Sequence, residues 1–288
     1  MDIYIGRASQ AVDFREAIYS GAIFLNTTLQ SAQDLVDHAI VCATEIFNNP
    51  SDLRTVHNSL KVEEFVSLVT ALKGKFTNSE RSKELIRAFV LEVGEDLNEY
   101  LFDVPRLRVV PNYEYLHAGV SYAYRPHRDT WYGSPPCQIN TWMPVFPIKP
   151  EQTMMINPAY FDRPVKNTSA EWSLRDWITA RRWTAKDNIR EENRVHPVPL
   201  DIIDPTGEIR FAGDRGDTII FSGAQLHGTV PNYTNHVRFS IDFRLIRIAD
   251  LMAGRGAKNV DSACKDVEAG FKDYFRVSDF ARFEEIAR

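Results

Sequence analysis

The sequence has few cysteines, no excess of basic residues and no long apolar run. Its 3 cysteines, Cys42, Cys137 and Cys264, are too few and too scattered for a disulfide framework, so we expect a cytoplasmic protein in a reducing compartment. A formal net charge of -5 argues against nucleic acid as a partner, because nucleic-acid binders usually carry a basic excess. No apolar run approaches the roughly 20 residues that span a bilayer. The first residues also lack the basic start and apolar core of a signal peptide, so we expect a soluble chain.

The amino-terminal third of the chain is predicted to be mostly helical. The 288 residues, 44% hydrophobic and 25% charged, have the balance of a globular protein with a buried core. In residues 29–47, Leu35, Ala39 and Cys42 recur at three- and four-residue steps, which indicates a helix with one buried stripe. The other elements predicted in this part are helices over residues 61–76 and 79–101 and a short strand over residues 21–26.

From about residue 105 the pattern changes to short alternating or apolar runs broken by turns, which is typical of strands. The predicted strands lie in residues 106–117, 120–126, 137–148, 153–161, 196–203, 217–223, 228–232 and 237–248. Because no helices alternate with them, an antiparallel barrel or a two-sheet sandwich is expected rather than a parallel α/β sheet. A helix-like insertion, residues 169–194, interrupts the strands, and helix is predicted again after about residue 250.

Three residues form a candidate metal-binding set. His127 and Asp129 are two residues apart where a predicted strand ends, so both side chains can reach a common point. His227 stands at the end of another predicted strand. Two imidazoles and one carboxylate on one face of a metal form the facial triad of non-haem Fe(II) oxygenases. By itself the His-x-Asp pattern is weak, and the alternative is that these histidines are solvated or belong to the core.

The strand predicted over residues 237–248 adds a candidate anion site. Its period of two places Arg238, Ser240 and Asp242 on one face. A guanidinium fork and a hydroxyl group side by side can hold a carboxylate. A buried Arg238 would need such an anion, and the distal carboxylate of 2-oxoglutarate is the natural one. The alternative is that Arg238 and Ser240 lie at the surface of an edge strand.

Taken together, these residues resemble the Fe(II)/2-oxoglutarate-dependent dioxygenases. The resemblance rests on His127, Asp129 and His227, on Arg238 eleven residues after the last histidine, and on Ser240 two residues further. The segment LHGTVPNYTNHVRFSIDF is most similar to the phytanoyl-CoA dioxygenase-like branch. The resemblance covers roughly residues 105–250. It implies a double-stranded β-helix, a jelly roll of the cupin-like kind, that is mainly β and is buttressed by the amino-terminal helices.

The resemblance also implies the division of the chain and its chemistry. A single domain, 1–288, would consist of a helical buttress (1–104), a jelly-roll core (105–250) with the insertion 169–194, and a helical tail (251–288). His127, Asp129 and His227 would hold Fe(II), and Arg238 and Ser240 would hold the cosubstrate 2-oxoglutarate. With O2, such an enzyme hydroxylates an unactivated C–H bond and releases succinate and CO2. In related halogenases a small residue replaces the carboxylate, so Asp129 argues for hydroxylation, desaturation or ring formation over halogenation.

The strand that follows the metal motif carries candidate substrate residues. Gln138, Asn140 and Trp142 share one face, and because buried polar groups need partners, this face would meet cosubstrate or substrate. The alternative is that the row faces solvent. Trp131 and Tyr132, just beyond Asp129, would wall the substrate pocket or simply fill a loop.

Two other classes of protein are compatible with the sequence. One is a jelly-roll metalloenzyme of different chemistry, such as an epimerase or a cosubstrate-free dioxygenase, which uses the same ligands. The other is a non-catalytic jelly-roll binding protein in which the histidines are incidental. The leading hypothesis remains an oxygenase acting on a small-molecule or carrier-bound metabolite. The pattern selects neither the substrate nor the oligomeric state.

Overall fold

Two β-sheets face each other in the computed structural model, which describes residues 2–6, 13–265 and 274–283. Among these residues, eight strands form the larger sheet and three form the smaller one. The larger sheet consists, in order, of β1 (Ile3–Ile5), β2 (Ile23–Asn26), β8 (Thr218–Ser222), β5 (Ile139–Pro144), β10 (Arg238–Arg247), β3 (Tyr100–Asp103) and β11 (Tyr274–Arg276), with β4 (Arg106–Val110) also paired to β10. The smaller sheet consists of β7 (Ile209–Arg210), β6 (Met154–Ile156) and β9 (His227–Thr229).

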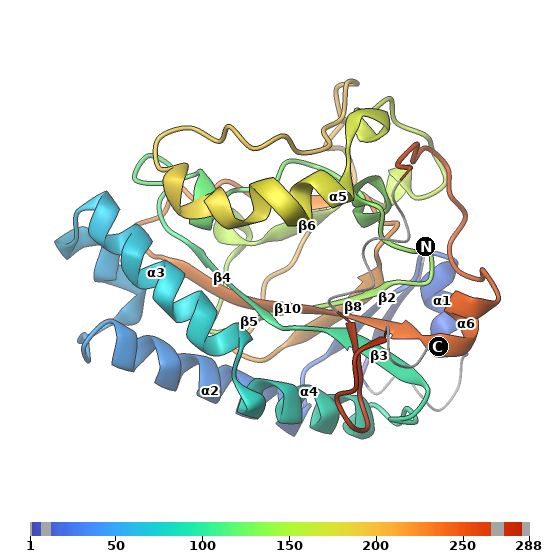
Figure 1. The fold of residues 1–288 in the computed structure, drawn as a ribbon, viewed down its shortest axis with the longest axis horizontal. Coiled ribbons are helices and arrows are strands. Elements are labelled where there is room, and N and C mark those ends of the chain that lie inside the picture. Colours follow the sequence, from blue (N-terminus) through green and yellow to red (C-terminus); the bar gives the residue numbers. More distant parts are fainter. Residues whose placement is uncertain (1, 7–12, 266–273, 284–288) are drawn as a thin grey trace.

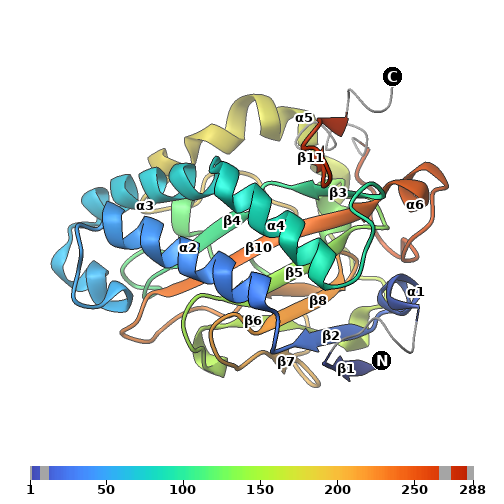
Figure 2. The same cartoon turned by 90° about the horizontal axis from the view of Figure 1, so that it is seen from below.

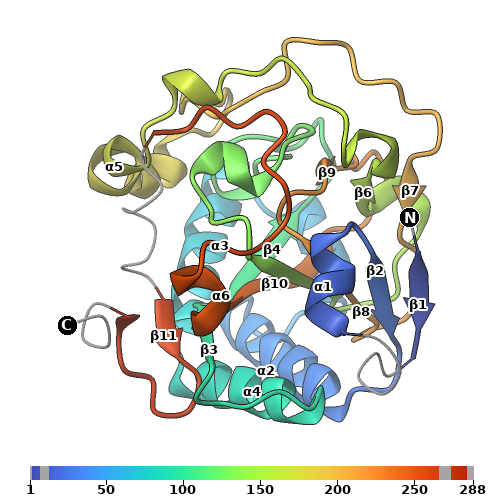
Figure 3. The same cartoon turned by 90° about the vertical axis from the view of Figure 1, so that its right-hand side faces the viewer.

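The path of the chain between the sheets is that of a jelly roll. From β4 in the larger sheet the chain passes to His127, which pairs with His227, the first residue of β9 in the smaller sheet, and then returns to β5. It next crosses to β6 and β7, back to β8, over to β9 and finally back to β10. Figure 3 shows β6, β7 and β9 on one side of β10 and the helices α2 and α4 on the other. The predicted fold class, a mainly β jelly roll with helices, is therefore confirmed, and the two sheets of the described part do not close into a barrel.

Three amino-terminal helices cover the outer face of the larger sheet, as Figure 2 shows. They are α2 (Gln30–Ile46), α3 (Val62–Thr77) and α4 (Glu80–Glu92). The oxygen of Ser79 accepts a hydrogen bond from the Ser82 N–H, which caps α4. Phe89 of α4 meets Phe243 of β10 edge to face, with the ring centroids 5.2 Å apart. The apolar face of β10 therefore packs on the helices, and its polar face is left for the space between the sheets.

Several predicted elements differ from the structure. The helix predicted over 79–101 ends at Glu92, because Gly94 adopts a φ of 92° and the Glu95 N–H turns back to the Val90 carbonyl. Residues 196–203 form no strand beyond a single bridge at Pro199, since the prolines Pro197 and Pro199 lack the N–H that a ladder needs. The strand predicted over residues 120–126 is absent. The chain forms a 3-10 helix over Gly119–Ser121 and is then irregular up to residue 126.

The carboxyl-terminal tail, residues 251–288, is not the predicted helix where the structure describes it. After α6 (Ile248–Met252) the chain runs irregularly, and β11 adds an antiparallel edge strand to β3. Its residues Tyr274 and Phe275 are aromatic and favour a strand, and β3 supplies the unpaired edge. The rest of the predicted tail helix, in residues 266–273 and 284–288, lies outside the described residues.

The insertion 169–194 is helical but irregular. It contains short helical pieces in succession, namely Ser169–Glu171, α5 (Leu174–Asp176), a π-helical turn over Trp177–Arg181 and a 3-10 helix over Arg182–Asp187. In Figure 1 it lies on the opposite side of the larger sheet from α2, α3 and α4. Among the described helices, none is both long enough and apolar enough to cross a bilayer.

Candidate active site

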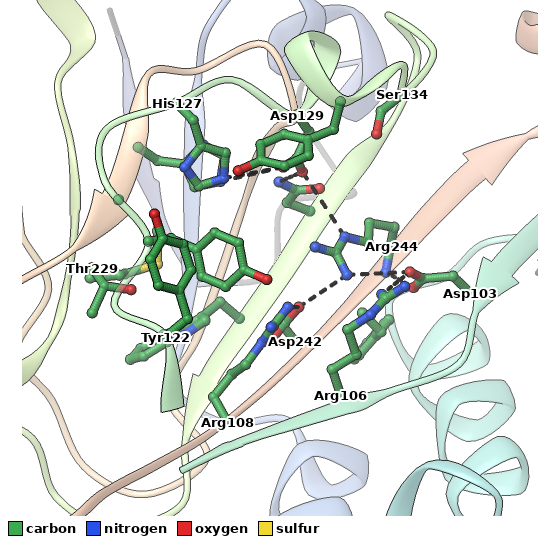
Figure 4. Close-up of a pocket in the computed structure, with 18 of the residues that line it drawn as sticks. Asp103, Arg106, Arg108, Tyr122, His127, Asp129, Ser134, Thr229, Asp242 and Arg244 are labelled. Carbon is green, nitrogen blue, oxygen red and sulfur yellow. Dashed lines mark hydrogen bonds and ion pairs between the residues drawn. The ribbon is translucent and has the colours of Figure 1, made fainter. Parts of the chain in front are cut away.

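The structure brings His127, Asp129 and His227 together between the two sheets. All three are buried, and their potential ligand atoms lie within 4.8 Å of one another. The Asp129 Oδ1 atom is 3.6 Å from His127 Nε2 and 3.7 Å from His227 Nε2. Main-chain hydrogen bonds fix this arrangement, because the N–H groups of His127 and His227 donate to each other's carbonyls at 2.8 and 2.9 Å. Figure 4 shows His127 and Asp129 facing the same space.

Backbone carbonyls orient both imidazoles. The Nδ1 atom of His127 lies 2.7 Å from the Arg125 carbonyl oxygen, and that of His227 lies 2.9 Å from the Gln225 carbonyl oxygen. Because a carbonyl only accepts, each Nδ1 must carry the proton, which leaves each Nε2 with a free lone pair. Burial and then the neighbouring His127 lower the pKa of His227 to about 4, so this imidazole is neutral at pH 7.

Two amide side chains orient the carboxylate of Asp129. Gln138 Nε2 and Asn140 Nδ2 donate to its Oδ2 atom at 2.7 and 2.6 Å, and Oδ1 is left for the imidazole side. The Tyr274 hydroxyl donates in turn to Gln138 Oε1 at 3.0 Å. Burial alone would raise the pKa of Asp129, but His127, His227 and Arg244 outweigh it and hold that pKa far below its usual value. The site thus presents two nitrogen lone pairs and one charged oxygen to a common point.

The same cavity, about 500 Å³ in volume, contains Arg238 on β10. Arg238 is buried and donates through Nη1 to the Thr153 carbonyl at 2.9 Å, but its Nε has no partner among the described residues. Burial, followed by repulsion from Arg108, lowers the pKa of Arg238 to about 10. Ser240, two residues along β10, is fully buried and does not itself line the cavity, but its hydroxyl is equally without a partner in the described part. These unsatisfied donors indicate a place for an anion.

A network of ion pairs lines the cavity, and it was not predicted from the sequence. Arg108 of β4 binds Asp242 of β10 through Nε, at 2.5 Å, and through Nη2, at 3.0 Å. Arg244 is 3.1 Å from Asp242, 3.3 Å from Asp103 and 4.0 Å from Asp129 Oδ2. In Figure 4, Arg244 lies between Asp129 and these two acidic groups. The sequence does show charged residues at every second position of these strands, namely residues 106 and 108 on β4 and residues 242 and 244 on β10. Only the strand register shows that these charges pair.

The other predicted site residues that line the cavity differ in their contacts. Gln138 and Asn140 point inward, as expected, although their contacts are with Asp129. Trp142 lines the cavity and meets Phe211 edge to face. Tyr132 lines it too, edge-on to the ring of His127.

The structure does not place the side chain of Trp131 in the cavity. Its side chain is fully buried and packs with Tyr160, Val165 and Leu226, and it does not line the cavity. Its indole N–H donates to Asp261 at 2.7 Å. The 3-10 turn Asp129–Tyr132 rotates successive side chains to different sides, whereas an extended chain would have returned the side chain of residue 131 to the face of residue 129.

No protein-family model and no curated protein matches the sequence. Among solved structures the chain is similar to EvdO2 from Micromonospora carbonacea var. aurantiaca, with 14% identity, a TM-score of 0.46 and coverage of 87% of this chain and 98% of that one. It is also similar to EctD from S. alaskensis, with 12% identity, a TM-score of 0.43 and coverage of 90% and 83%. A third is the epimerase SnoN in complex with Fe3+, alpha ketoglutarate and nogalamycin RO, with 11% identity, a TM-score of 0.41 and coverage of 81% and 83%.

Proposed function

We propose that the protein is a non-haem Fe(II)/2-oxoglutarate-dependent oxygenase that hydroxylates an unactivated C–H bond of a small-molecule or carrier-bound metabolite. The observation that carries this proposal is the presence, in one cavity, of three converging ligand atoms and an arginine without an ion-pair partner among the described residues. The phytanoyl-CoA dioxygenase-like pattern of the sequence points to the same chemistry. Succinate and CO2 would be the products of the cosubstrate.

The residues present fit a ferrous ion. His127, His227 and Asp129 would hold it through two imidazole nitrogens and one carboxylate oxygen, the donor set of the 2-His-1-carboxylate sites. Gln138 and Asn140 occupy the second oxygen of Asp129, which favours one-oxygen ligation. When bound, the iron together with 2-oxoglutarate and O2 supplies the oxidising power for C–H hydroxylation.

The residues present also fit 2-oxoglutarate. Arg238 lines the cavity, and Ser240 is buried two residues further along β10 without itself lining it; each has a polar atom with no partner among the described residues. A carboxylate would offset the cost of the buried guanidinium, because a charge that is removed from water needs a partner. Arg238 would therefore bind and orient the distal carboxylate, and Ser240 would donate one further hydrogen bond.

Turnover of 2-oxoglutarate without a substrate tests this function. With Fe(II) and O2, the wild-type protein should slowly form succinate, and Asp129→Ala should form none. If iron binds but no condition yields succinate, the same ligands serve another reaction, such as epimerisation or a cosubstrate-free oxygenation. If no metal binds, the chain is a binding protein whose histidines are incidental.

A further inference from the structure

An aromatic wall lines the part of the cavity that the proposed metal and cosubstrate residues do not use. It consists of Tyr122, Tyr124, Tyr132, Trp172 and Trp177, all of which line the cavity. These rings surround His196, which stacks on Tyr122 with the centroids 4.4 Å apart and meets Trp177 at 4.9 Å. Because Tyr132 also lies edge-on to His127, at 5.2 Å, the wall begins beside the metal-binding set. Aromatic walls of this kind favour the ring or hydrocarbon body of a ligand.

The insertion that carries Trp172 and Trp177 is fixed to the core. Glu192 accepts from the Gly119 N–H at 2.9 Å, and Arg194 donates to the Gly119 carbonyl at 2.9 Å and to Glu192 at 2.7 Å. Gly119 has a φ of 58°, and a Cβ atom there would lie 2.2 Å from the Ala185 and Asn188 carbonyl oxygens. Only glycine allows this approach, so the aromatic wall is part of the folded cavity.

The buried and half-buried cations that line the cavity fall into two groups. Arg106, Arg108, Arg194 and Arg244 each have a carboxylate partner. In the part of the chain that the structure describes, Lys73 and Arg238 have none within ion-pair distance. Arg238 is accounted for by the proposed cosubstrate site. Lys73 is therefore a second cation that lacks an anion.

Lys73 projects from α3 of the amino-terminal buttress into the cavity. Its Nζ donates to the Val120 carbonyl, next to Gly119 and the insertion. Burial and then repulsion from Arg108 lower the pKa of Lys73 to about 7; attraction to the Asp242 carboxylate offsets part of this lowering, and Arg194 adds to the repulsion. An ammonium in this position gains most from an anion that arrives with the ligand, since the carbonyl carries no compensating charge.

We propose that the part of the cavity lined by the aromatic wall and Lys73 binds the substrate. We further propose that the substrate is an organic acid with an aromatic or apolar body. Lys73 binds the anionic group, and the aromatic wall packs against the body. This inference rests on the proposed function, because it places the substrate beside the metal-binding set. It makes Lys73 a specificity-determining residue of the helical buttress. A carboxylate and a phosphate would satisfy it equally.

Three ligands that share a naphthalene ring test the contributions of the anionic group and of the apolar body to binding separately. Binding of 1-naphthoate, 1-naphthyl phosphate and the neutral 1-naphthamide is measured by anaerobic calorimetry on protein loaded with Fe(II) and saturating 2-oxoglutarate. We expect the acids to bind about tenfold more tightly than the amide, the usual scale of one charged hydrogen bond. In Lys73→Met the preference should disappear, and in Lys73→Arg it should persist. Trp177→Ala should weaken the acids and the amide alike.

Three outcomes would overturn the inference. They are equal binding of acid and amide, a preference that survives in Lys73→Met, and a preference that is lost in Arg238→Ala instead, which would place the probe in the cosubstrate site. Lys73→Gln keeps a donor for the Val120 carbonyl, so it replaces Lys73→Met if that variant does not fold. Repeating the titration without iron and 2-oxoglutarate tests the subsite alone. A preference there, with no metal binding, would refute the proposed function and leave the subsite standing.

Discussion

The side-chain amide of Asn140 donates a 2.6 Å hydrogen bond to Oδ2 of Asp129, the oxygen that faces away from the two imidazoles. Gln138 donates to the same atom, so β5 holds the carboxylate in a single orientation. Gln138 and Asn140, which the sequence predicts to meet cosubstrate or substrate, therefore contact the proposed metal ligand Asp129 instead. Their role is to decide which oxygen atom of Asp129 is free.

Asn140→Leu should lower Fe(II) affinity about 10- to 100-fold, the usual cost of losing such support behind a metal ligand. The physical reason is that Asp129 loses one of its two amide donors, so its carboxylate is held less firmly in one orientation. Metal competition against a chromogenic chelator measures the effect. Met143→Leu, on the opposite face of the same strand, is the matched control, because Met143 packs in the hydrophobic core and does not line the cavity. An equal loss in both variants would point to general damage to β5.

Arg238→Ala should weaken 2-oxoglutarate binding about 100-fold and leave Fe(II) affinity unchanged, because the guanidinium lines the cavity but is not among the metal-binding set. Arg238→Lys should recover only part of the affinity, since lysine lacks the planar fork. Calorimetric titration of the cosubstrate into the iron-loaded protein checks both. Arg210→Ala, on the exposed side of β7, serves as the control. Unchanged cosubstrate affinity in Arg238→Ala would mean that another residue holds the carboxylate.

The contact between the insertion and the core should depend on acid pH through Glu192. Burial would raise the pKa of Glu192, but the His196 imidazole, 3.8 Å away, and the hydrogen bonds from Arg194 outweigh it and lower that pKa from 4.5 to about 2. A carboxyl group whose pKa is lower in the folded state stabilises that state fully above its unfolded pKa. The stabilisation should therefore disappear as the pH falls from about 4.5 through about 2. Limited proteolysis of residues 169–194 against pH reports it, and Glu192→Gln should abolish the dependence in this window.

Asp261→Asn should destabilise the fold by about 3 kcal/mol, because it leaves the buried guanidinium of Arg128 without its carboxylate. Asp261 accepts from Arg128 Nε at 3.0 Å, from the Trp131 indole at 2.7 Å and from the Val165 N–H at 3.0 Å. Denaturant unfolding measures the change. Asp201→Asn, at an exposed carboxylate that accepts from the Lys166 N–H, should cost far less. Similar losses of stability in the two variants would show that the buried Arg128–Asp261 ion pair contributes no more to stability than an exposed carboxylate does.

The sequence predicted those parts of the site that a single strand or turn determines. The period of two on β10 places Arg238, Ser240 and Asp242 on one face without knowledge of any neighbour. The amphipathic stripe of α2 is equally local, and Leu35 and Ala39 are buried as it predicts. By contrast, no single strand or turn predicts that His127 and His227 lie together. That prediction depended on the resemblance to a known family, and the structure does bring the two residues together.

What the sequence could not predict depends on register and on distant partners. The pairing of Arg108 with Asp242 requires the alignment of β4 with β10, which are separated by more than a hundred residues. Lys73 is one lysine among several on helical segments until the packing of α3 places it in the cavity. The tail became a strand at residues 274–276 because β3 offered an open edge, which local propensity does not record.

The most direct test of the account is the visible spectrum of the protein under anaerobic Fe(II) and 2-oxoglutarate. Simultaneous binding of both at one centre should produce a weak charge-transfer band. The band should be absent in Asp129→Ala, and in Arg238→Ala it should require much more 2-oxoglutarate. A band that persists in Asp129→Ala, or no band in wild-type protein that has bound iron, would contradict the assignment of this cavity.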